Sequence, residues 1–213
     1  MENKAFNVKL QKNPLISIRV IPGHFTASST HTSHYLDLSV MKSNATIARD
    51  VAKELARPYL TSTPVETIVC MGRTEVIGAF LAQELMQSGL NVVNQNTDVY
   101  VMTPLVNDVG TLSFTSSMLQ HIVNRQVLLL TTWALSGSTL DRVFNTMSFY
   151  GAKIAGISSL FVVNPESMEQ NINTLFTSND IEGFKLYSPR NCELCKAGIR
   201  LDALISSEGY TRV

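Results

Sequence analysis

The sequence predicts an α/β fold in which helices flank a mostly parallel central sheet. Short apolar runs typical of buried strands alternate with amphipathic stretches of ten or more residues. Apolar residues make up 45% of the chain and charged residues 16%, which provides enough material for a core and too little charge for disorder. The length of 213 residues suits one α/β domain with an appended subdomain.

Charge and hydropathy argue against two classes of partner. The 17 basic residues balance the 17 acidic ones, so no global field attracts nucleic acid. The sequence contains no run of about 18 apolar residues, so it predicts no membrane-spanning helix. The first eleven residues are polar and lack the apolar core of a signal peptide. We therefore expect a cytoplasmic protein that binds neither nucleic acid nor membrane.

The elements follow in order along the chain. Residues 9–38, rich in Ser, Thr and His around short apolar pieces, predict irregular structure with short strands. Residues 44–59 predict a helix, because apolar side chains recur at every fourth position from Ile47 to Leu55, and Asn44 or the serine before it can cap its start. The later elements are predicted as strand 67–71, helix 75–88, strand 98–103, helix 116–124, strand 126–132, helix 139–150 and strand 153–163.

This alternation indicates where a ligand would bind. Strands separated by helices imply right-handed crossovers and a parallel sheet. In such sheets ligands bind beyond the carboxyl ends of the strands. We therefore expect the chemistry in the loops that follow Met71, Thr103 and Thr132.

The loop after strand 126–132 has the composition of an anion site. It reads Leu135, Ser136, Gly137, Ser138 and Thr139. The glycine permits close backbone approach, and the hydroxyls combine with the free N–H groups of a helix start to favour a phosphate monoester. A Ser/Thr helix cap without a ligand is the alternative. A nucleotide P-loop is disfavoured because no lysine follows the glycine, and the sequence has no G-x-G-x-x-G fingerprint.

This segment resembles the phosphoribosyl pyrophosphate (PRPP) motif of type I phosphoribosyltransferases, which has four hydrophobic residues, two acids, two apolar residues and then Thr-Thr-Gly-Gly-Thr or a close variant. The resemblance implies that residues 135–139 bind the 5′-phosphate. Thr131 and Thr132 fall on the two acids, which in the family contact the ribose hydroxyls. The chain departs from the family there, because neutral hydroxyls bind more weakly than carboxylates.

Three further segments resemble the orotate branch of this family in the expected order. Residues 23–37 resemble the opening that forms a hood over the base, which implies base-binding roles for Phe25, Ser28 and Ser29. Residues 68–79 resemble the strand and loop that hold pyrophosphate. Residues 192–199 resemble the Cys-x-x-Cys-Lys-x-Gly tail of some orotate phosphoribosyltransferases.

The pyrophosphate loop would consist of Gly72, Arg73 and Thr74. The glycine allows tight approach, and the arginine supplies a fixed charge with a fork of donors. A second departure from the family lies in residues 104–111. The orotate branch has a mobile basic loop there, whereas this stretch contains no Lys, Arg or His and cannot supply cations to pyrophosphate.

The resemblance implies a phosphoribosyltransferase, a glycosyltransferase of pyrimidine nucleotide metabolism. It would transfer ribose 5-phosphate from PRPP to a nitrogenous base such as orotate, with Mg²⁺, as a homodimer. It also implies a hood segment at 1–43, a core at 44–185 and a tail at 186–213 that packs on the hood or core. The alternative is a catalytically degenerate protein that binds a phosphoribosyl ligand or has a regulatory function. A third hypothesis is a phosphate-binding α/β protein outside the family.

The histidines and cysteines are candidate metal ligands. His24, His31 and His34 lie within eleven residues, and we expect polar loop histidines, although His31 or His34 could face the base site. Cys192 and Cys195 form one Cys-x-x-Cys, whereas a structural zinc site needs four ligands. A knuckle-like turn with reduced thiols is the expectation, and a zinc site completed by a second pair from a symmetry mate is the alternative. A redox motif lacks its strand–motif–helix context.

Overall fold

The computed structural model describes residues 2–27, 30–87, 93–95, 97–107, 112–134, 137–168, 170–206 and 209–213, with the backbone alone for residues 137–140 and 167. The chain divides into two compact units. Unit 1 comprises Met1–Val40 and Ser178–Val213, and unit 2 comprises Met41–Thr177.

Unit 2 contains a five-stranded parallel sheet with the order β10-β9-β8-β4-β5. Its strands are β4 (Thr67–Met71), β5 (Tyr100–Met102), β8 (Gln126–Ala134), β9 (Lys153–Val162) and β10 (Asn173–Thr177), and a separate hairpin is formed by β6 (Leu105–Val106) and β7 (Leu112–Ser113). Its helices are α1 (Ser39–Ser43, shared with unit 1), α2 (Ala45–Ala56), α3 (Glu75–Met86), α4 (Ser116–Leu119), α5 (Gly137–Phe149) and the 3-10 turn η2 (Pro165–Ser167).

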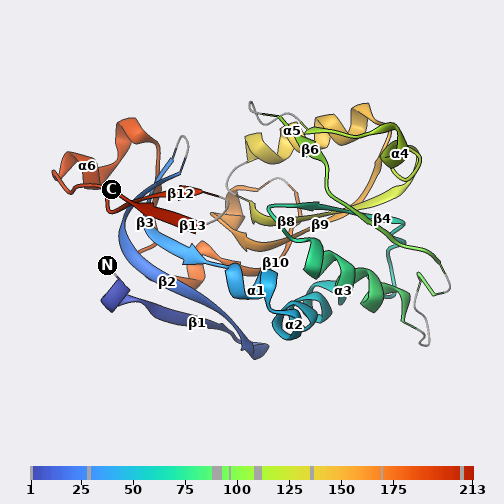
Figure 1. The fold of residues 1–213 in the computed structure, drawn as a ribbon, viewed down its shortest axis with the longest axis horizontal. Helices are drawn as coiled ribbons and strands as arrows, with labels where there is room; N and C mark the ends of the chain where they lie inside the picture. The colour runs from blue at the N-terminus through green and yellow to red at the C-terminus, as the bar shows by residue number, and fades with distance from the viewer. Residues whose placement is uncertain are drawn as a thin grey trace. The chain divides into compact units, whose positions relative to one another are not determined.

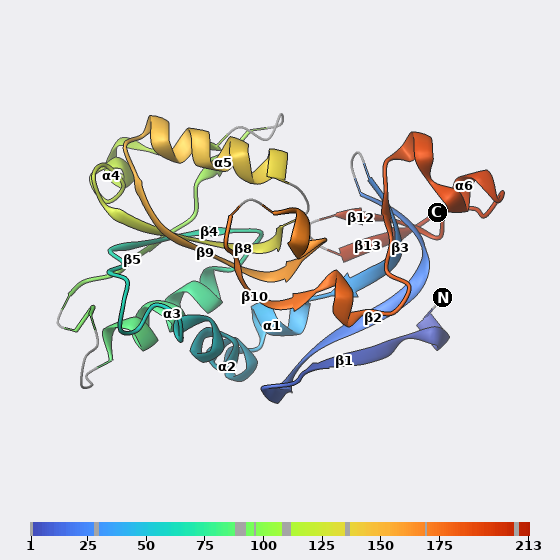
Figure 2. The same cartoon turned by 180° about the vertical axis from the view of Figure 1, so that it is seen from behind.

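Helices cover both faces of this sheet. Figures 1 and 2 show α2 and α3 on one face and α5 on the other. α3 contacts β4 and β5, whereas α5 contacts β8 and β9. The apolar residues of β4 and β8 are buried between these layers, as expected for strands covered on both sides. The predicted fold class, a parallel sheet flanked by helices, is therefore confirmed.

Local signals placed most elements of unit 2 correctly. β4 has the predicted bounds, and Asn44 caps α2 by accepting hydrogen bonds from the amides of Thr46 and Ile47, at 3.0 and 3.2 Å. The predicted helix 116–124 is wrong beyond Leu119. The chain leaves the helix in turns that end at Asn124, whose φ of 60° is left-handed. β8 runs two residues further than predicted, to Ala134.

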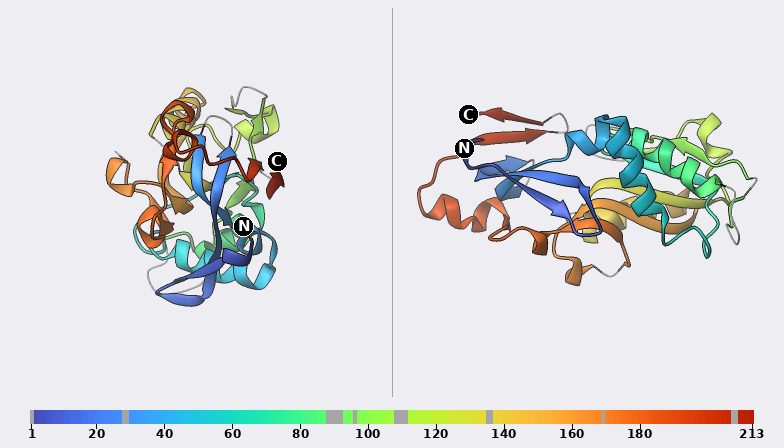
Figure 3. Two further views of the ribbon diagram at one scale, coloured as in Figure 1. Left: turned by 90° about the vertical axis from the view of Figure 1, so that its left-hand side faces the viewer. Right: turned by 90° about the horizontal axis from the view of Figure 1, so that it is seen from below.

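Unit 1 is built on a six-stranded sheet with the order β11-β3-β2-β12-β13, and β1 pairs with β2. Its strands are β1 (Phe6–Leu10), β2 (Asn13–Ala27), β3 (Thr30–Asp37), β11 (Leu186–Tyr187), β12 (Ala203–Ser206) and β13 (Gly209–Arg212). Its helical segments are η1 (Glu2–Lys4), η3 (Ser178–Asp180), η4 (Pro189–Asn191) and α6 (Glu193–Lys196). Figure 3 shows β12 and β13, in red, as a pair of strands.

The prediction of irregular structure for residues 9–38 is wrong, because this stretch forms the long strands β2 and β3. Ile16, Ile18 and Val20 are fully buried at alternate positions, which is the period of a strand with one covered face. A small core forms around Phe25 and Tyr35 with Ile21 and Ala203. The prediction overestimated the effect of Ser and Thr in this segment, because threonine is common in strands.

Across both units, none of the helices among the described residues is long and apolar enough to cross a membrane.

Candidate functional site

The topology of unit 2 picks out one point on the sheet edge. From β4 the chain passes through α3 to β5 on one side, and later reaches β8 on the other side of β4. The strand order therefore reverses between β4 and β8. Ligands of open α/β sheets bind in the crevice outside the carboxyl ends of the strands at such a switch point. Met71 pairs with Thr131, so the turn after β4 and the end of β8 lie next to each other.

The turn after β4 has an unusual backbone. Gly72 and Arg73 both have left-handed conformations, with φ of 71° and 65°. A non-glycine residue in this region is uncommon, and such strain gathers at functional sites. Glycine is required at the first position for a second reason, because a Cβ atom there would lie 2.6 Å from Thr132 Oγ1. The turn exposes both residues at the sheet edge.

The carbonyl of Gly72 anchors the turn to two neighbours. Thr132 Oγ1 donates a hydrogen bond to it at 2.6 Å, and Lys42 Nζ donates to it at 3.4 Å. Lys42 thus brings a second cation to the turn that carries Arg73. The sequence did not indicate this lysine, because it lies in α1 and no motif includes it. The turn after β4 thus has two cationic side chains, Arg73 within it and Lys42 bonded to its carbonyl, although the chain has no net charge.

The hydroxyls at the end of β8 are engaged by the protein itself. Thr131 and Thr132 are buried, and Thr131 Oγ1 donates to the carbonyl of Trp133 at 3.2 Å. Both hydroxyls donate their proton to a backbone carbonyl and retain only acceptor capacity for a ligand. Thr74 is fully buried, and its Oγ1 lies 3.2 Å from the carbonyls of Met71 and Leu130. Its side chain therefore links β4 to β8 and is not available to a ligand.

The predicted phosphate loop leads directly into α5. Leu135 and Ser136 lie outside the described residues, whereas Gly137, Ser138 and Thr139 form the first turn of this helix. The first amides of a helix have no partner within it and carry the positive end of its dipole. A 13-residue helix that starts at the carboxyl end of β8 is thus a suitable anion site. In the predicted loop 104–111, Leu105 and Val106 form β6, and residues 108–111 lie outside the described residues.

Comparison with known proteins bears on the fold. No family model matches the sequence, and no curated protein matches it. The solved structure of Leishmania donovani UMP synthase is similar with a TM-score of 0.53 and 16% identity, over 75% of this chain and 34% of that chain. Adenine phosphoribosyltransferase from Leishmania tarentolae is similar with a TM-score of 0.50 and 13% identity, over 70% of this chain and 79% of that chain.

The fold is that of the type I phosphoribosyltransferases. Identities this low show the fold alone, and this chain covers only 34% of the UMP synthase chain. The loops after β4 and β8 are the two that the sequence predicts to bind the pyrophosphate and the 5′-phosphate.

A magnesium ion would accompany PRPP in this fold, and we tested whether the described residues fit it. Protein-bound Mg²⁺ takes carboxylate oxygens and keeps several waters. At the end of β8 the neutral Thr131 and Thr132 replace the acids, and both hydroxyls face backbone carbonyls. Glu75, at the start of α3, accepts a hydrogen bond from Thr103 Oγ1 at 2.8 Å. The residues described at this edge thus offer no paired carboxylates for the ion.

The predicted base-binding residues belong to unit 1. Phe25 has no exposed surface and packs with Tyr35 and Tyr210, with ring centroids 6.0 and 6.5 Å away. Ser28 and Ser29 lie outside the described residues. The base-binding assignment stays a prediction, and the observed burial of Phe25 gives it no support.

Two other features of unit 2 do not contribute to this site. Burial raises the pKa of the Cys70 thiol to about 12, which leaves it protonated and removes it as a nucleophile. A cavity of about 710 Å³ lies at the amino ends of the strands, where Tyr100 stacks on His121 and Arg125 pairs with Glu66. In parallel sheets ligands bind at the opposite ends.

Proposed function

We propose that this protein binds PRPP at the carboxyl ends of β4 and β8 and transfers its ribose 5-phosphate to a nitrogenous base, in the manner of orotate phosphoribosyltransferase. One observation carries the proposal: at the switch point of a phosphoribosyltransferase fold, a strained basic turn lies beside the start of a long helix. A phosphorylated sugar with a second phosphate group at its other end matches two adjacent anion sites.

The two anion sites would divide the ligand between them. The first amides of α5 take the 5′-phosphate. Arg73, Lys42 and the amides of the turn take the pyrophosphate. Negative charge grows on pyrophosphate as its bond to C1 of ribose breaks, while the sugar gains oxocarbenium character. Fixed cations at the leaving group would therefore stabilise the transition state more than the ground state.

A second candidate is a protein that binds the phosphoribosyl ligand without turnover. The observation in its favour is the pair Thr131 and Thr132, whose hydroxyl protons are used by backbone carbonyls. Carboxylates at these positions would accept strong hydrogen bonds from the ribose hydroxyls and favour the positive charge of the transition state. Without them, binding survives through phosphate contacts, but the catalytic contribution is reduced.

Calorimetry and a turnover assay separate the two candidates. We expect PRPP with Mg²⁺ to bind with one site per chain, and ribose 5-phosphate to bind more weakly because it lacks the pyrophosphate. Orotate, uracil, adenine and hypoxanthine are then added and pyrophosphate release is measured. Release with one base supports the transferase, and binding without release with any base supports the second candidate. Absence of PRPP binding contradicts both.

A charge placed at the start of α5 tests the 5′-phosphate site. Gly137→Asp puts a carboxylate where the phosphate is expected, so PRPP affinity should fall by at least 100-fold, or about 3 kcal/mol. Asn145→Asp adds the same charge at an exposed position of the same helix and should leave affinity within about threefold. Equal affinities for the two variants would remove α5 from the proposal.

The homodimer and the cytoplasmic compartment remain predictions from the sequence. Light scattering of the purified chain is the direct measurement of the first, and we expect the mass of two chains with and without PRPP.

A further inference from the structure

Four side chains of unit 1 converge on one point. They are His24 on β2, His31 on β3, Cys192 just before α6 and Cys195 within it, and their nearest nitrogen and sulfur atoms all lie within 4.8 Å of one another. The expectation that His24, His31 and His34 are polar loop residues is wrong, since all three lie on strands and His24 is 1% exposed. The second pair of ligands that the Cys-x-x-Cys lacks in sequence is supplied by the same chain.

Four of the six distances between these atoms are close to the edges of a tetrahedron around a metal. With Zn–N of about 2.0 Å and Zn–S of about 2.3 Å, tetrahedral geometry requires about 3.3 Å between two nitrogens and about 3.5 Å between nitrogen and sulfur. His24 Nε2 lies 3.1 Å from His31 Nδ1. The Sγ of Cys192 lies 3.4 Å from His24 Nε2, and the Sγ of Cys195 lies 3.6 and 3.3 Å from His24 Nε2 and His31 Nδ1.

Hydrogen bonding alone accounts poorly for this cluster. His24 Nδ1 lies 2.8 Å from the carbonyl of Ile199, so it carries the ring proton and leaves Nε2 as a lone pair. That single lone pair faces His31 and both sulfurs, and it can accept one good hydrogen bond. A cation at the centre would accept a lone pair from all four atoms. The bond to Ile199 is also the outer contact that orients metal-binding histidines.

Local structure explains how each ligand reaches this point. The pairing of β2 with β3 shifts register between Pro22 and Phe25, and such a bulge re-aims the side chain of His24. The Cys-x-x-Cys segment forms a tight turn, in which the amides of Lys196 and Gly198 donate to the carbonyls of Cys192 and Cys195 at 3.1 and 3.0 Å. Gly198, with φ of 72°, then returns the chain so that Ile199 meets His24.

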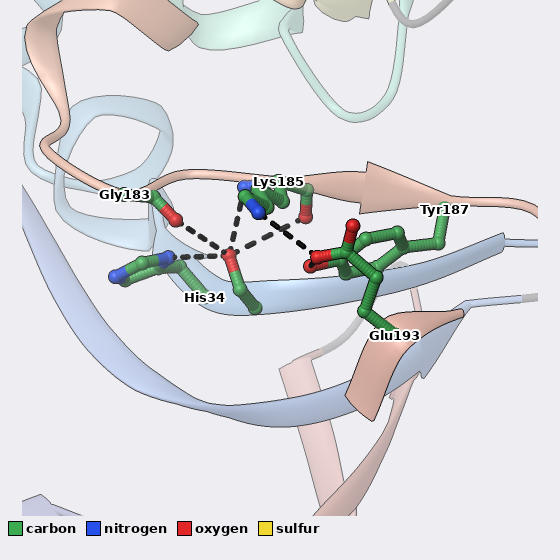
Figure 4. Close-up of polar contacts among 6 residues, drawn as sticks. His34, Gly183, Lys185, Tyr187 and Glu193 are labelled. Atoms are coloured by element: carbon green, nitrogen blue, oxygen red, sulfur yellow. Dashed lines mark hydrogen bonds and ion pairs between the residues drawn. The ribbon is translucent and has the colours of Figure 1, made fainter. Parts of the chain in front are cut away.

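Surface contacts bring the cysteine segment close to β3 but hold it weakly. Lys185 and Tyr187 donate hydrogen bonds to Glu193 at 2.9 and 3.2 Å (Figure 4). Ser33 Oγ accepts a hydrogen bond from the amide of Lys185 at 2.8 Å. β11 pairs with β3 so that Tyr187 lies opposite His31. The Lys185–Glu193 pair is more than half exposed on both sides, and exposed pairs contribute little stability. A bound metal would hold the segment much more firmly.

We propose that His24, His31, Cys192 and Cys195 bind one structural zinc ion that holds the C-terminal segment to the β2–β3 hairpin. Sulfur and imidazole donors in a tetrahedral set favour zinc over magnesium or calcium. Four protein ligands complete the coordination and leave no open position for a substrate, which makes the site structural. It is a separate site from the proposed PRPP site, whose residues belong to unit 2.

Metal analysis of the full chain tests the proposal. The protein, purified without chelator and dialysed against metal-free buffer, should contain one zinc ion per chain by mass spectrometry. X-ray absorption should show two sulfurs at about 2.3 Å and two nitrogens at about 2.0 Å. The double variant His31→Asn/Cys195→Ser should lose the metal. The control Cys70→Ser/His121→Asn changes a thiol and an imidazole outside the cluster and should retain it.

A second measurement covers the case in which the double variant does not fold. Chelated wild-type protein is titrated with Co²⁺, which should produce thiolate-to-cobalt charge-transfer absorption that saturates at one equivalent and disappears when Zn²⁺ is added. Full zinc content in the double variant would overturn the proposal. So would a wild-type protein that contains no zinc and gives no cobalt spectrum under reducing conditions.

Discussion

At the scale of single residues, Arg73 combines a charge with an unfavourable backbone. Its φ of 65° costs about 1–2 kcal/mol for a residue with a Cβ atom. Glycine removes this strain, although its greater conformational freedom in the unfolded chain lowers the stability of the folded state by about 0.5–1 kcal/mol. The fold would therefore be at least as stable with glycine at position 73 as it is with arginine. In the proposed function this guanidinium contacts the pyrophosphate, a contact that glycine could not make.

Two substitutions separate strain from charge at this position. Arg73→Gly should leave the free energy of unfolding in urea unchanged or raise it by up to about 1 kcal/mol. Arg73→Ala keeps the strain and should show no gain. Both should weaken PRPP binding at least tenfold, because a charge-assisted contact is lost. Full affinity in Arg73→Gly would show that the side chain has no part in binding.

Sequence reasoning located this turn but not its inner contacts. Gly72 and Arg73 were predicted to hold pyrophosphate because they follow a buried strand and resemble a known loop. Lys42 could not be predicted, since its approach to Gly72 depends on how α1 packs. Thr74 carries a hydroxyl that looks available in sequence, and only the structure shows it buried against Leu130.

At the scale of elements, the close packing of α3 on β4 depends on a glycine. A Cβ atom at Gly78 would lie 2.5 Å from Cys70 Sγ and 3.1 Å from Val101 Cγ1. Alanine is intrinsically better than glycine within a helix by about 1 kcal/mol. Here the clash should outweigh that preference, because overpacking a core costs about 1–3 kcal/mol. Since β4 leads directly into the basic turn, this contact also positions the proposed site.

A double-mutant cycle measures that contact. We expect Gly78→Ala to destabilise unit 2 by about 1–3 kcal/mol, and Cys70→Ala to cost about 1 kcal/mol through a small cavity. The double variant should be more stable than the sum of the two predicts, by at least about 1 kcal/mol, because the new methyl group occupies space left by the sulfur. Urea unfolding gives all three values. Strict additivity would place the strain elsewhere, for example on Val101.

Elements with strong local signals were predicted and those that depend on distant partners were not. α2 has a cap and a regular apolar face, and β4 has a continuous apolar run, so both could be predicted from sequence. β12 and β13 are short strands that pair with each other, and β12 also pairs with β2, which lies far away in sequence. Nothing local indicates them. The metal cluster has the same limitation, since His24 and Cys192 are 168 positions apart.

At the scale of the whole molecule, each of the two units contains one of the two proposed ligand sites. The proposed zinc site joins the first 40 residues to the C-terminal segment within unit 1, whereas the proposed PRPP site lies within unit 2. A ligand that binds only the folded form stabilises the unit to which it binds, by an amount set by its concentration and affinity. Local stability can therefore be changed in one unit at a time.

Hydrogen exchange measured by mass spectrometry tests this separation. Removal of zinc by a chelator should speed amide exchange in β3, β11 and the segment around α6, because the cross-link between them is lost. Exchange in β4 and β8 should stay the same. Addition of PRPP should slow exchange in the turn after β4 and at the start of α5, with little change around Cys192. If chelation instead accelerates exchange equally in both units, the two units share one cooperative core, and the zinc ion stabilises the whole chain.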